Sequence, residues 1–372
     1  MYLLGNRRMA SGSTDLVECE PAFTLGCEEA PFLPGVDATS AAGLAQIEER
    51  RKQLLFQDLD QLARKHQIGQ GDILLINSLR HWSLEPVIEW FEKVGPSRAP
   101  VVVLILHYTP HRQLGVPDAA ASVYQKAFRR LANSPVRSRI LLCTDSEQLS
   151  AEYRNLHDLP IAVLPVPHCG APAGEAEPEH DVLSVVFAGE ARADKGFDLL
   201  APAIREVLST SPRREVVFNI QAYGTEGRPE AAIRTKFPVS DAVRVHSHPL
   251  DERQYEAFIG TADLVLIPYS TAPYRAQTSG IYCEAAALGI PVVVPSGTWM
   301  ADQVLKRGGG VLFESGNPAS LAQACLEALR NYGDLRQSAI RAAPAWRSFH
   351  NAANFIGHLK ALIRDLPIVR EA

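Results

Sequence analysis

The sequence has no long apolar run, no closely spaced pair of cysteines and no large excess of one charge. No apolar stretch approaches the ~20 residues needed to span a bilayer, and the start has no signal-peptide pattern. The six cysteines are scattered without a C-x-x-C pair, which is typical of reduced thiols in a cytosolic protein. A net charge of −5 disfavours a nucleic-acid-binding surface spread over the whole protein. We therefore expect a soluble, cytoplasmic protein without a nucleic-acid partner.

Over 372 residues, 46% are hydrophobic and 21% are charged, which is ordinary globular composition. This length predicts two domains, each large enough to bury its own core. Short apolar runs without clean alternation indicate strands that are covered on both faces. The predicted strands are 72–77, 100–107, 139–144 and 161–165 in the first half, and 182–188, 215–222, 243–247, 262–268, 291–295 and 310–313 in the second.

Segments of helical period separate these runs, and one more, 41–66, precedes them. Alternation of strand and helix predicts an α/β fold with a parallel sheet in each half. The Pro-, Gly- and Glu-rich stretch 165–181 contains the best candidate linker. The predicted parts are a Rossmann-like domain over 1–166, a linker over 167–181, a second Rossmann-like domain over 182–345, and a helical segment over 346–372 that packs back on the first domain.

The strongest local pattern is TSGIYCEAAALGIPVVV at 278–294. Thr278 or Ser279 can cap a helix that starts just beyond the strand 262–268, and Gly280 allows close approach to its backbone. A helix N-terminus at the carboxyl edge of a parallel sheet favours phosphate. Glu284 lies one turn further along, where its carboxylate can accept hydrogen bonds from ribose hydroxyls. The alternative is an ordinary capped core helix with a surface glutamate.

The second pattern is VVFAGEARADKGFDLL at 185–200, where a strand leads into a loop that carries Arg192 and Lys195. Two cations at the carboxyl end of a strand can neutralise a diphosphate leaving group. A solvated basic loop is the alternative. It is less favoured because this loop and Gly280 are expected at the same edge of the sheet.

Together, the G-x-x-x-x-x-K-G-F pattern at 189–197, ADLVLIP, the pattern SG-x-x-x-E-A-x-A-x-G-x-P-V-V-V and the segment 310–330 resemble the donor domain of family 4 glycosyltransferases. The resemblance covers about 182–345 well and the first domain in outline. It implies the GT-B fold, with two Rossmann-like domains facing each other across a cleft. It also implies sugar transfer from a nucleotide-diphosphate donor to a saccharide or lipid-linked acceptor, with retention of configuration. Neither a metal nor a cofactor is expected beyond the nucleotide sugar as co-substrate, and polysaccharide biosynthesis is the implied setting.

The resemblance also implies roles for individual residues. Lys195 and Arg192 match groups that bind the donor diphosphate, Glu284 matches the residue that holds the ribose, and a histidine at the position of His107 often touches the sugar. The implied catalytic residues are Lys195, Glu284 and His107. The implied donor-binding residues are Gly189, Arg192, Lys195, Thr278, Ser279, Gly280, Ile281, Glu284 and Thr298.

The sequence departs from the family pattern in three places. The first glutamate of the two-glutamate motif is Ala276, although Tyr274 with Ser279 and Gly280 matches a Y-x-x-x-x-S-G form. Glu190 stands where the family has arginine. The opening strand and Gly-rich loop are missing, so that MYLLG resembles the second strand of the family and 6–40 becomes a candidate cover for the exposed edge.

The alternative function is a non-catalytic homologue that binds a nucleotide sugar or a partner subunit. An epimerase is disfavoured because no cluster suited to proton transfer is visible.

Several other residues carry weaker signals. His107 could be purely structural, Trp299 could be packing, and the pair His246 and His248 lacks a third metal ligand in reach. A basic stretch predicts either a solvated helix face or peripheral contact with an anionic membrane at its inner face, and the solvated face is favoured. Its residues are Lys126, Arg129, Arg130, Arg137 and Arg139.

Overall fold

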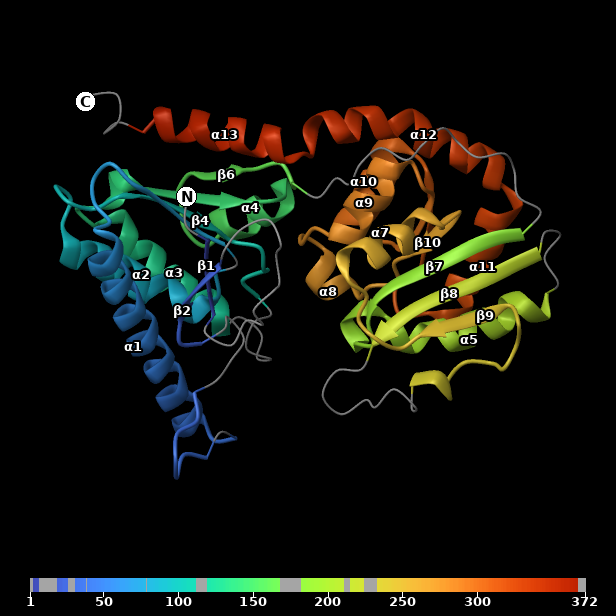
Figure 1. Cartoon of the computed structure of the whole chain (residues 1–372), viewed down its shortest axis with the longest axis horizontal. Coiled ribbons are helices and arrows are strands. Elements are labelled where there is room, and N and C mark those ends of the chain that lie inside the picture. The colour runs from blue at the N-terminus through green and yellow to red at the C-terminus, as the bar shows by residue number, and fades with distance from the viewer. Residues whose placement is uncertain are drawn as a thin grey trace. The chain divides into compact units, whose positions relative to one another are not determined.

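The computed structural model describes residues 3–6, 19–25, 31–37, 39–77, 79–111, 119–167, 182–210, 215–223 and 233–366. The chain divides into two compact units (Figure 1). Unit 1 comprises Met1–Leu164 with Leu359–Ala372, and unit 2 comprises Pro165–His358. Nearly all of the predicted linker, 168–181, lies outside the described residues.

Unit 1 contains a four-stranded parallel sheet in the order β3-β4-β5-β6. Every residue of β4 is buried, as its run of five β-branched and leucine residues predicts for a central strand covered on both faces. The strands are β3 (Ile73–Ile76), β4 (Val101–Ile105), β5 (Ile140–Thr144) and β6 (Ile161–Val163). The accompanying helices are α1 (Ala41–His66), α2 (His81–Val94), α3 (Ala119–Ala132) and α4 (Glu147–Arg154). The strands and helices predicted for this half are confirmed.

The opening segment forms a separate sheet in which β1 (Leu3–Asn6) pairs in parallel with β2 (Cys19–Phe23). The described part of MYLLG, from Leu3, is thus in a strand, but the interpretation of it as a strand of the main sheet is wrong, because its described partner is β2. Thr24, directly after β2, donates two hydrogen bonds to Asp58 of α1, from its backbone nitrogen at 2.7 Å and its hydroxyl at 2.8 Å. These bonds attach the small sheet to the long helix.

Unit 2 contains a six-stranded parallel sheet in the order β12-β11-β10-β7-β8-β9. The first strand therefore lies in the middle and the strand order reverses between β7 and β10, as in a doubly wound nucleotide-binding fold. Its strands are β7 (Val182–Glu190), β8 (Glu215–Tyr223), β9 (Val243–His246), β10 (Leu264–Leu266), β11 (Val292–Pro295) and β12 (Gly310–Phe313).

Helices cover both faces of this sheet (Figure 1). Alternate residues of β7 explain why: Val185 and Phe187 lie in the core with α5 and α11, whereas Val186 and Ala188 lie in the core with α9 and α10. The helices of this unit are α5 (Phe197–Ser209), α7 (Glu252–Gly260), α8 (Thr271–Tyr274), α9 (Gly280–Leu288), α10 (Trp299–Arg307), α11 (Pro318–Arg330) and α12 (Tyr332–Phe349).

The C-terminal segment consists of two helices, since α12 ends at Phe349 and α13 (Ala352–Arg364) follows. His350 stands at the break. Its ring stacks on Trp346, with centroids 4.1 Å apart, and its Nδ1 accepts a hydrogen bond from the backbone nitrogen of Val166 at 3.1 Å. Burial and, to a smaller degree, the charge of Arg307 lower the pKa of His350 to about 4.

The depressed pKa of His350 predicts acid sensitivity. The neutral ring is favoured in the folded state, so its contribution to stability is present above the ordinary pKa of 6.5 and is lost as pH falls toward 4. Between pH 7 and pH 5 we expect a loss of about 1–2 kcal/mol in the free energy of unfolding from this group. Urea titrations of wild type and His350→Gln at both pH values test this. Equal losses in the two proteins would contradict it.

Candidate functional site

The carboxyl ends of β7 and β10 meet where the strand order of unit 2 reverses, which is the place where open α/β sheets bind ligands. Gly189, near the end of β7, has φ 147° and donates its backbone N–H to the side-chain oxygen of Gln221 on β8 at 2.8 Å. Glu190 accepts a hydrogen bond from the hydroxyl of Tyr223 at 3.2 Å. The end of β7 is therefore fixed against β8 before the loop begins.

The two cations of the next loop have different environments. The guanidinium of Arg192 pairs with Glu190 and with Asp194, each at 3.1 Å. Lys195 has no carboxylate within 4 Å among the described residues. The charge of Arg192 is thus locally balanced and that of Lys195 is not.

Lys195 is held against two aromatic rings. Its ammonium nitrogen lies 4.0 Å from the ring centroid of Tyr269 and 4.9 Å from that of Tyr274, both of which are buried. The two rings are themselves in contact, with centroids 4.5 Å apart. Burial and, secondarily, the neighbouring charge of Arg192 lower the pKa of Lys195 to about 8. A desolvated ammonium of this kind gains much from an anionic ligand.

This arrangement depends on a close approach between the two strand ends. Gly196 has φ 70°, and a Cβ added there would lie 1.8 Å from the carbonyl oxygen of Pro268. The backbone nitrogen of Ser270 donates to the carbonyl oxygen of Asp194 at 2.9 Å. The loop after β7 is thereby fixed on the segment after β10, and Lys195 is brought to Tyr269.

The helix α9 begins at the same edge. Its N-cap is Ser279, whose buried side chain accepts from the backbone nitrogen of Tyr282 at 3.3 Å and whose hydroxyl faces that of Tyr269. Gly280 and Ile281 open the helix, so their N–H groups have no partner within it. Thr278 is half-buried just before the cap. The helix predicted at this position and its Ser279 cap are confirmed.

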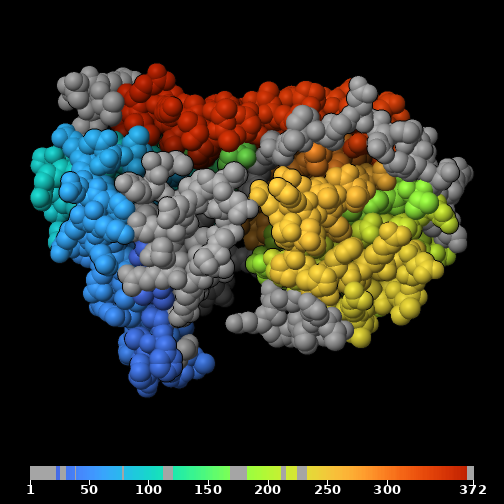
Figure 2. Space-filling model, in the orientation of Figure 1, coloured from blue at the N-terminus to red at the C-terminus, as the bar shows by residue number. Residues whose placement is uncertain are grey.

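Glu284 lies on α9 and accepts a hydrogen bond from the hydroxyl of Tyr255 at 2.5 Å. Tyr255 comes from α7, an otherwise largely exposed helix on the face of unit 2 that Figure 2 shows in yellow and orange. Burial and the nearby Glu284 carboxylate raise the pKa of Tyr255, so its hydroxyl remains a donor. No sequence pattern pointed to Tyr255, because nothing in the sequence of α7 shows which side chain reaches α9.

The turn after β11 adjoins this edge through Thr271, whose hydroxyl donates to the carbonyl oxygen of Ser296 at 3.3 Å. Thr298 is buried and caps α10: its hydroxyl accepts from the backbone nitrogen of Ala301 at 3.2 Å and donates to the carbonyl oxygen of Pro295 at 2.8 Å. Trp299 packs edge-on against Tyr282. The hydroxyl of Thr298 therefore uses both its donor and an acceptor position in local hydrogen bonds at the start of α10.

His107 belongs to unit 1, just after β4. Its Nδ1 lies 2.7 Å from a carboxylate oxygen of Asp145, and its Nε2 is hydrogen-bonded to the side-chain oxygen of Asn77. Neither partner was singled out in the sequence, although Asn77 is the last residue of one predicted strand and Asp145 directly follows another.

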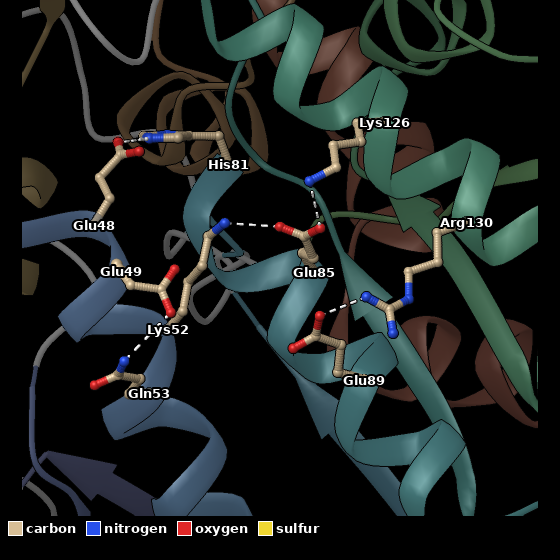
Figure 3. Close-up of polar contacts among 9 residues, drawn as sticks. All are labelled: Glu48, Glu49, Lys52, Gln53, His81, Glu85, Glu89, Lys126 and Arg130. Carbon is tan, nitrogen blue, oxygen red and sulfur yellow. Dashed lines mark hydrogen bonds and ion pairs between the residues drawn. The ribbon is translucent and has the colours of Figure 1, made fainter. Parts of the chain in front are cut away.

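Two of the five residues in the basic stretch of unit 1 pair with acidic residues of α2 (Figure 3). Lys126 pairs with Glu85 at 3.0 Å, and Arg130 pairs with both Glu89 and Glu92. Arg139 is buried and Arg137 donates to a backbone carbonyl oxygen at 2.9 Å. The ion pairs of Lys126 and Arg130 reduce the positive charge that this helix face would offer to an anionic membrane, so they favour the solvated helix face.

Neither a metal-binding cluster nor a membrane-spanning helix occurs in the described part of the chain. No group of three or more His, Cys, Asp and Glu side chains is arranged to hold a metal ion there. None of the described helices combines the length and apolarity needed to cross a membrane. His246 lies against Phe258, with ring centroids 5.3 Å apart.

The fold defined by the two units is GT-B, as solved structures show. Sucrose-phosphate synthase from Thermosynechococcus elongatus aligns over 89% of this chain and 82% of its own, with TM-score 0.61 and 14% identity. HepE from Anabaena, solved in complex with UDP, aligns over 88% and 83%, with TM-score 0.60 and 14% identity. A mutant of S. aureus TarM, in complex with fondaparinux, alpha-GlcNAc-glycerol and UDP, aligns over 85% and 59%, with TM-score 0.61 and 13% identity.

Sequence comparison finds a match within the second unit. Residues 183–331 match the family model described as glycosyl transferases group 1. This match contains the Lys195 loop, Ser279 and Glu284. No curated protein matches the chain significantly.

The contact between Gly196 and Pro268 predicts that Gly196→Ala destabilises unit 2. A Cβ would require both a left-handed backbone and displacement of a carbonyl group, which should cost at least about 2 kcal/mol. Gly333→Ala is the matched control, since Gly333 lies near the start of α12 with no atom within 4 Å of an added Cβ. Urea unfolding should show the control unchanged or stabilised by up to ~1 kcal/mol. Similar midpoints for the two variants would contradict the assigned contact.

Proposed function

We propose that the protein is a retaining glycosyltransferase that moves a sugar from a nucleotide-diphosphate donor to a saccharide or lipid-linked acceptor. The donor binds unit 2 and the acceptor binds unit 1. The proposal includes cytoplasmic location, supported by the free, buried thiols of Cys143, Cys283 and Cys325.

One observation supports this proposal more strongly than any other. A desolvated lysine ammonium, without a carboxylate partner among the described residues, lies at the strand edge where the N-terminus of α9 also begins. Both features favour an anion, and both fall inside the domain that matches group 1 glycosyltransferases. A diphosphate is the anion that this arrangement suits.

This geometry supports the proposed roles of individual residues. Lys195 and the N–H groups of Gly280 and Ile281 bind the diphosphate, and Glu284, held by Tyr255, accepts hydrogen bonds from the ribose. Arg192 is already paired with two acids, so its part in donor binding requires that these pairs rearrange. Gly189, Thr278 and Thr298 complete the proposed donor site through their positions at its edge.

In the proposed reaction, the bond between the sugar C1 and the diphosphate oxygen breaks while the bond from C1 to the acceptor oxygen forms on the same face. The departing phosphate accepts the proton of the acceptor hydroxyl, so no metal is needed. Negative charge grows on the diphosphate as the bond breaks, and Lys195 stabilises that charge.

A non-catalytic nucleotide-sugar-binding homologue is the second candidate. Ala276 favours it, because a buried methyl group stands where the resemblance predicts a glutamate that contacts the donor sugar. Retention of Lys195 and Glu284 favours the enzyme, since binding alone has less need of both.

We expect UDP, GDP or a similar nucleoside diphosphate to bind without a divalent metal. The affinity should be constant at neutral pH and fall above pH 8, approaching tenfold per pH unit, because Lys195 must then take up a proton to pair with the diphosphate. Calorimetry with and without EDTA at pH 7 and pH 9 measures both effects. Lys195→Met should bind weakly with little pH dependence in this range. Loss of wild-type binding on adding EDTA would refute the metal-free site.

Two substitutions should fail in different ways. Lys195→Ala should lower turnover far more than donor affinity, by about 3–4 kcal/mol of transition-state stabilisation. Glu284→Gln should mainly raise the apparent donor binding constant, because the ribose changes little during reaction. Tyr255→Phe should reproduce part of the Glu284→Gln effect, about fivefold, by removing the hydrogen bond to Glu284.

Steady-state kinetics and thermal unfolding of each variant make this comparison. Wild-type kinetics in both Lys195→Ala and Glu284→Gln would show that the site is wrongly assigned. Nucleotide binding without turnover of any donor would favour the non-catalytic homologue.

A further inference from the structure

A hollow of about 530 Å³ lies among three helices of unit 1, α1, α2 and α3. The middle helix, α2, packs against both of the others, and no strand residue lines the hollow. Its volume falls in the range of about 300–1,000 Å³ that is typical of ligand sites. The lining residues of α1 have the spacing of a single helix face. They are Glu49, Lys52, Gln53, Phe56 and Gln57.

The buried residue Glu85 of α2 organises the walls of the hollow. Its carboxylate accepts a hydrogen bond from Lys52 of α1 at 2.7 Å and pairs with Lys126 of α3 at 3.0 Å, so the two ammonium groups reach it from different helices (Figure 3). Burial raises the pKa of the Glu85 carboxyl, but hydrogen bonds from Lys52 and Lys126 outweigh burial and hold the pKa below its ordinary value. One carboxylate therefore holds a hydrogen-bond donor in place on each wall.

The stability of the fold gives little reason for this arrangement. The side chain of Lys126 is 72% exposed, and an ion pair with so exposed an ammonium group contributes little to the free energy of unfolding. Ordering two long side chains also costs conformational entropy. For a ligand, however, donors that are already ordered lower the cost of binding.

Acceptors and an aromatic ring complete the hollow. The carboxylate of Glu49 accepts a hydrogen bond from the side-chain amide of Gln53 at 3.3 Å, and both residues are exposed. The half-buried ring of Phe56 lies next to them on α1, with the ammonium nitrogen of Lys93 5.0 Å from its centroid. The hollow therefore combines donors, acceptors and an apolar ring surface.

The ion pairs of the hollow favour a neutral ligand. Glu85 is paired with both lysines, and Glu89, the other lining residue of α2, is paired with Arg130 of α3 (Figure 3). A charged ligand would have to separate such a pair and leave one partner without its counter-ion. A hydroxyl group both donates and accepts, so a polyhydroxyl ligand can bridge ammonium and carboxylate groups without separating them.

We propose that this hollow binds a neutral oligosaccharide, at a site formed by helix faces rather than by strand ends. Lys52 and Lys126 donate to sugar oxygens, and Glu49 and Glu89 accept from sugar hydroxyls. The Phe56 ring contacts the C–H face of a sugar ring. Calling this ligand the distal part of the acceptor rests on the proposed glycosyltransferase function. The oligosaccharide site itself needs only unit 1.

Calorimetry on the full chain tests this site with neutral and charged probes. The neutral probes are maltotetraose, cellotetraose and chitotetraose, and the charged probes are spermine and a sulfated heparin tetrasaccharide. We expect at least one neutral tetrasaccharide to bind. Lys126→Met and Gln53→Ala should each weaken its binding on the order of fivefold, because each removes hydrogen-bonding groups from the hollow. Both side chains are exposed, so thermal unfolding should match that of wild type.

The matched control is Lys306→Met, the same chemical change at an exposed lysine in the last turn of α10 in unit 2. It should bind the tetrasaccharide as wild type does. Three results would overturn the proposal: no binding of any neutral tetrasaccharide, binding of the charged probes alone, or equal tetrasaccharide binding by wild type, Lys126→Met and Gln53→Ala.

Parallel calorimetry with UDP and GDP separates this site from the proposed function. Tetrasaccharide binding that depends on Lys126 and Gln53, without binding of either nucleotide, would support the oligosaccharide site and contradict the glycosyltransferase function. Nucleotide binding without tetrasaccharide binding would overturn the oligosaccharide site and leave the glycosyltransferase function standing.

Discussion

The close approach of Gly196 to the carbonyl of Pro268 is the contact on which the candidate site depends. It joins the loop after β7 to the segment after β10, the two strands between which the sheet order reverses. Because Gly196 has no side chain, the loop can lie against the backbone of its neighbour, and Lys195 is carried onto the ring of Tyr269. With a larger residue the loop would have to lift, and the ammonium would return to water.

Arg192 and Lys195 look equivalent in the sequence, but they differ in burial and in their charged neighbours. Arg192 is neutralised by Glu190 and Asp194, whereas Lys195 faces aromatic rings and the start of α9. An ammonium in such a position costs stability when no anion is bound, as its lowered pKa indicates. That cost is expected at a functional site rather than in a core built only for stability.

Similarity to known proteins is detected by sequence in unit 2 alone, whereas structural similarity extends over most of the chain. The group 1 family model covers 183–331, yet the structural likeness to sucrose-phosphate synthase extends over 89% of the chain. Unit 1 needs only buried apolar strands to keep its fold, and many sequences meet that requirement. The candidate site in unit 2 would add a requirement for a particular loop, helix cap and acidic residue at one edge of the sheet, which would limit the residues allowed there.

The sequence by itself determined the elements and the order of the candidate residues. Apolar runs predicted the strands, because parallel strands covered on both faces must be apolar throughout. Local capping chemistry at Thr278 or Ser279 predicted the start of α9, and the structure identifies Ser279 as the cap. Tertiary structure alone decided that Tyr255 reaches Glu284, that Asp145 and Asn77 hold His107, and that β1 leaves the main sheet for β2. These contacts join residues at least 16 positions apart in the chain. Local periodicity carries no information about which distant segments become neighbours; only packing of the strands and helices determines that.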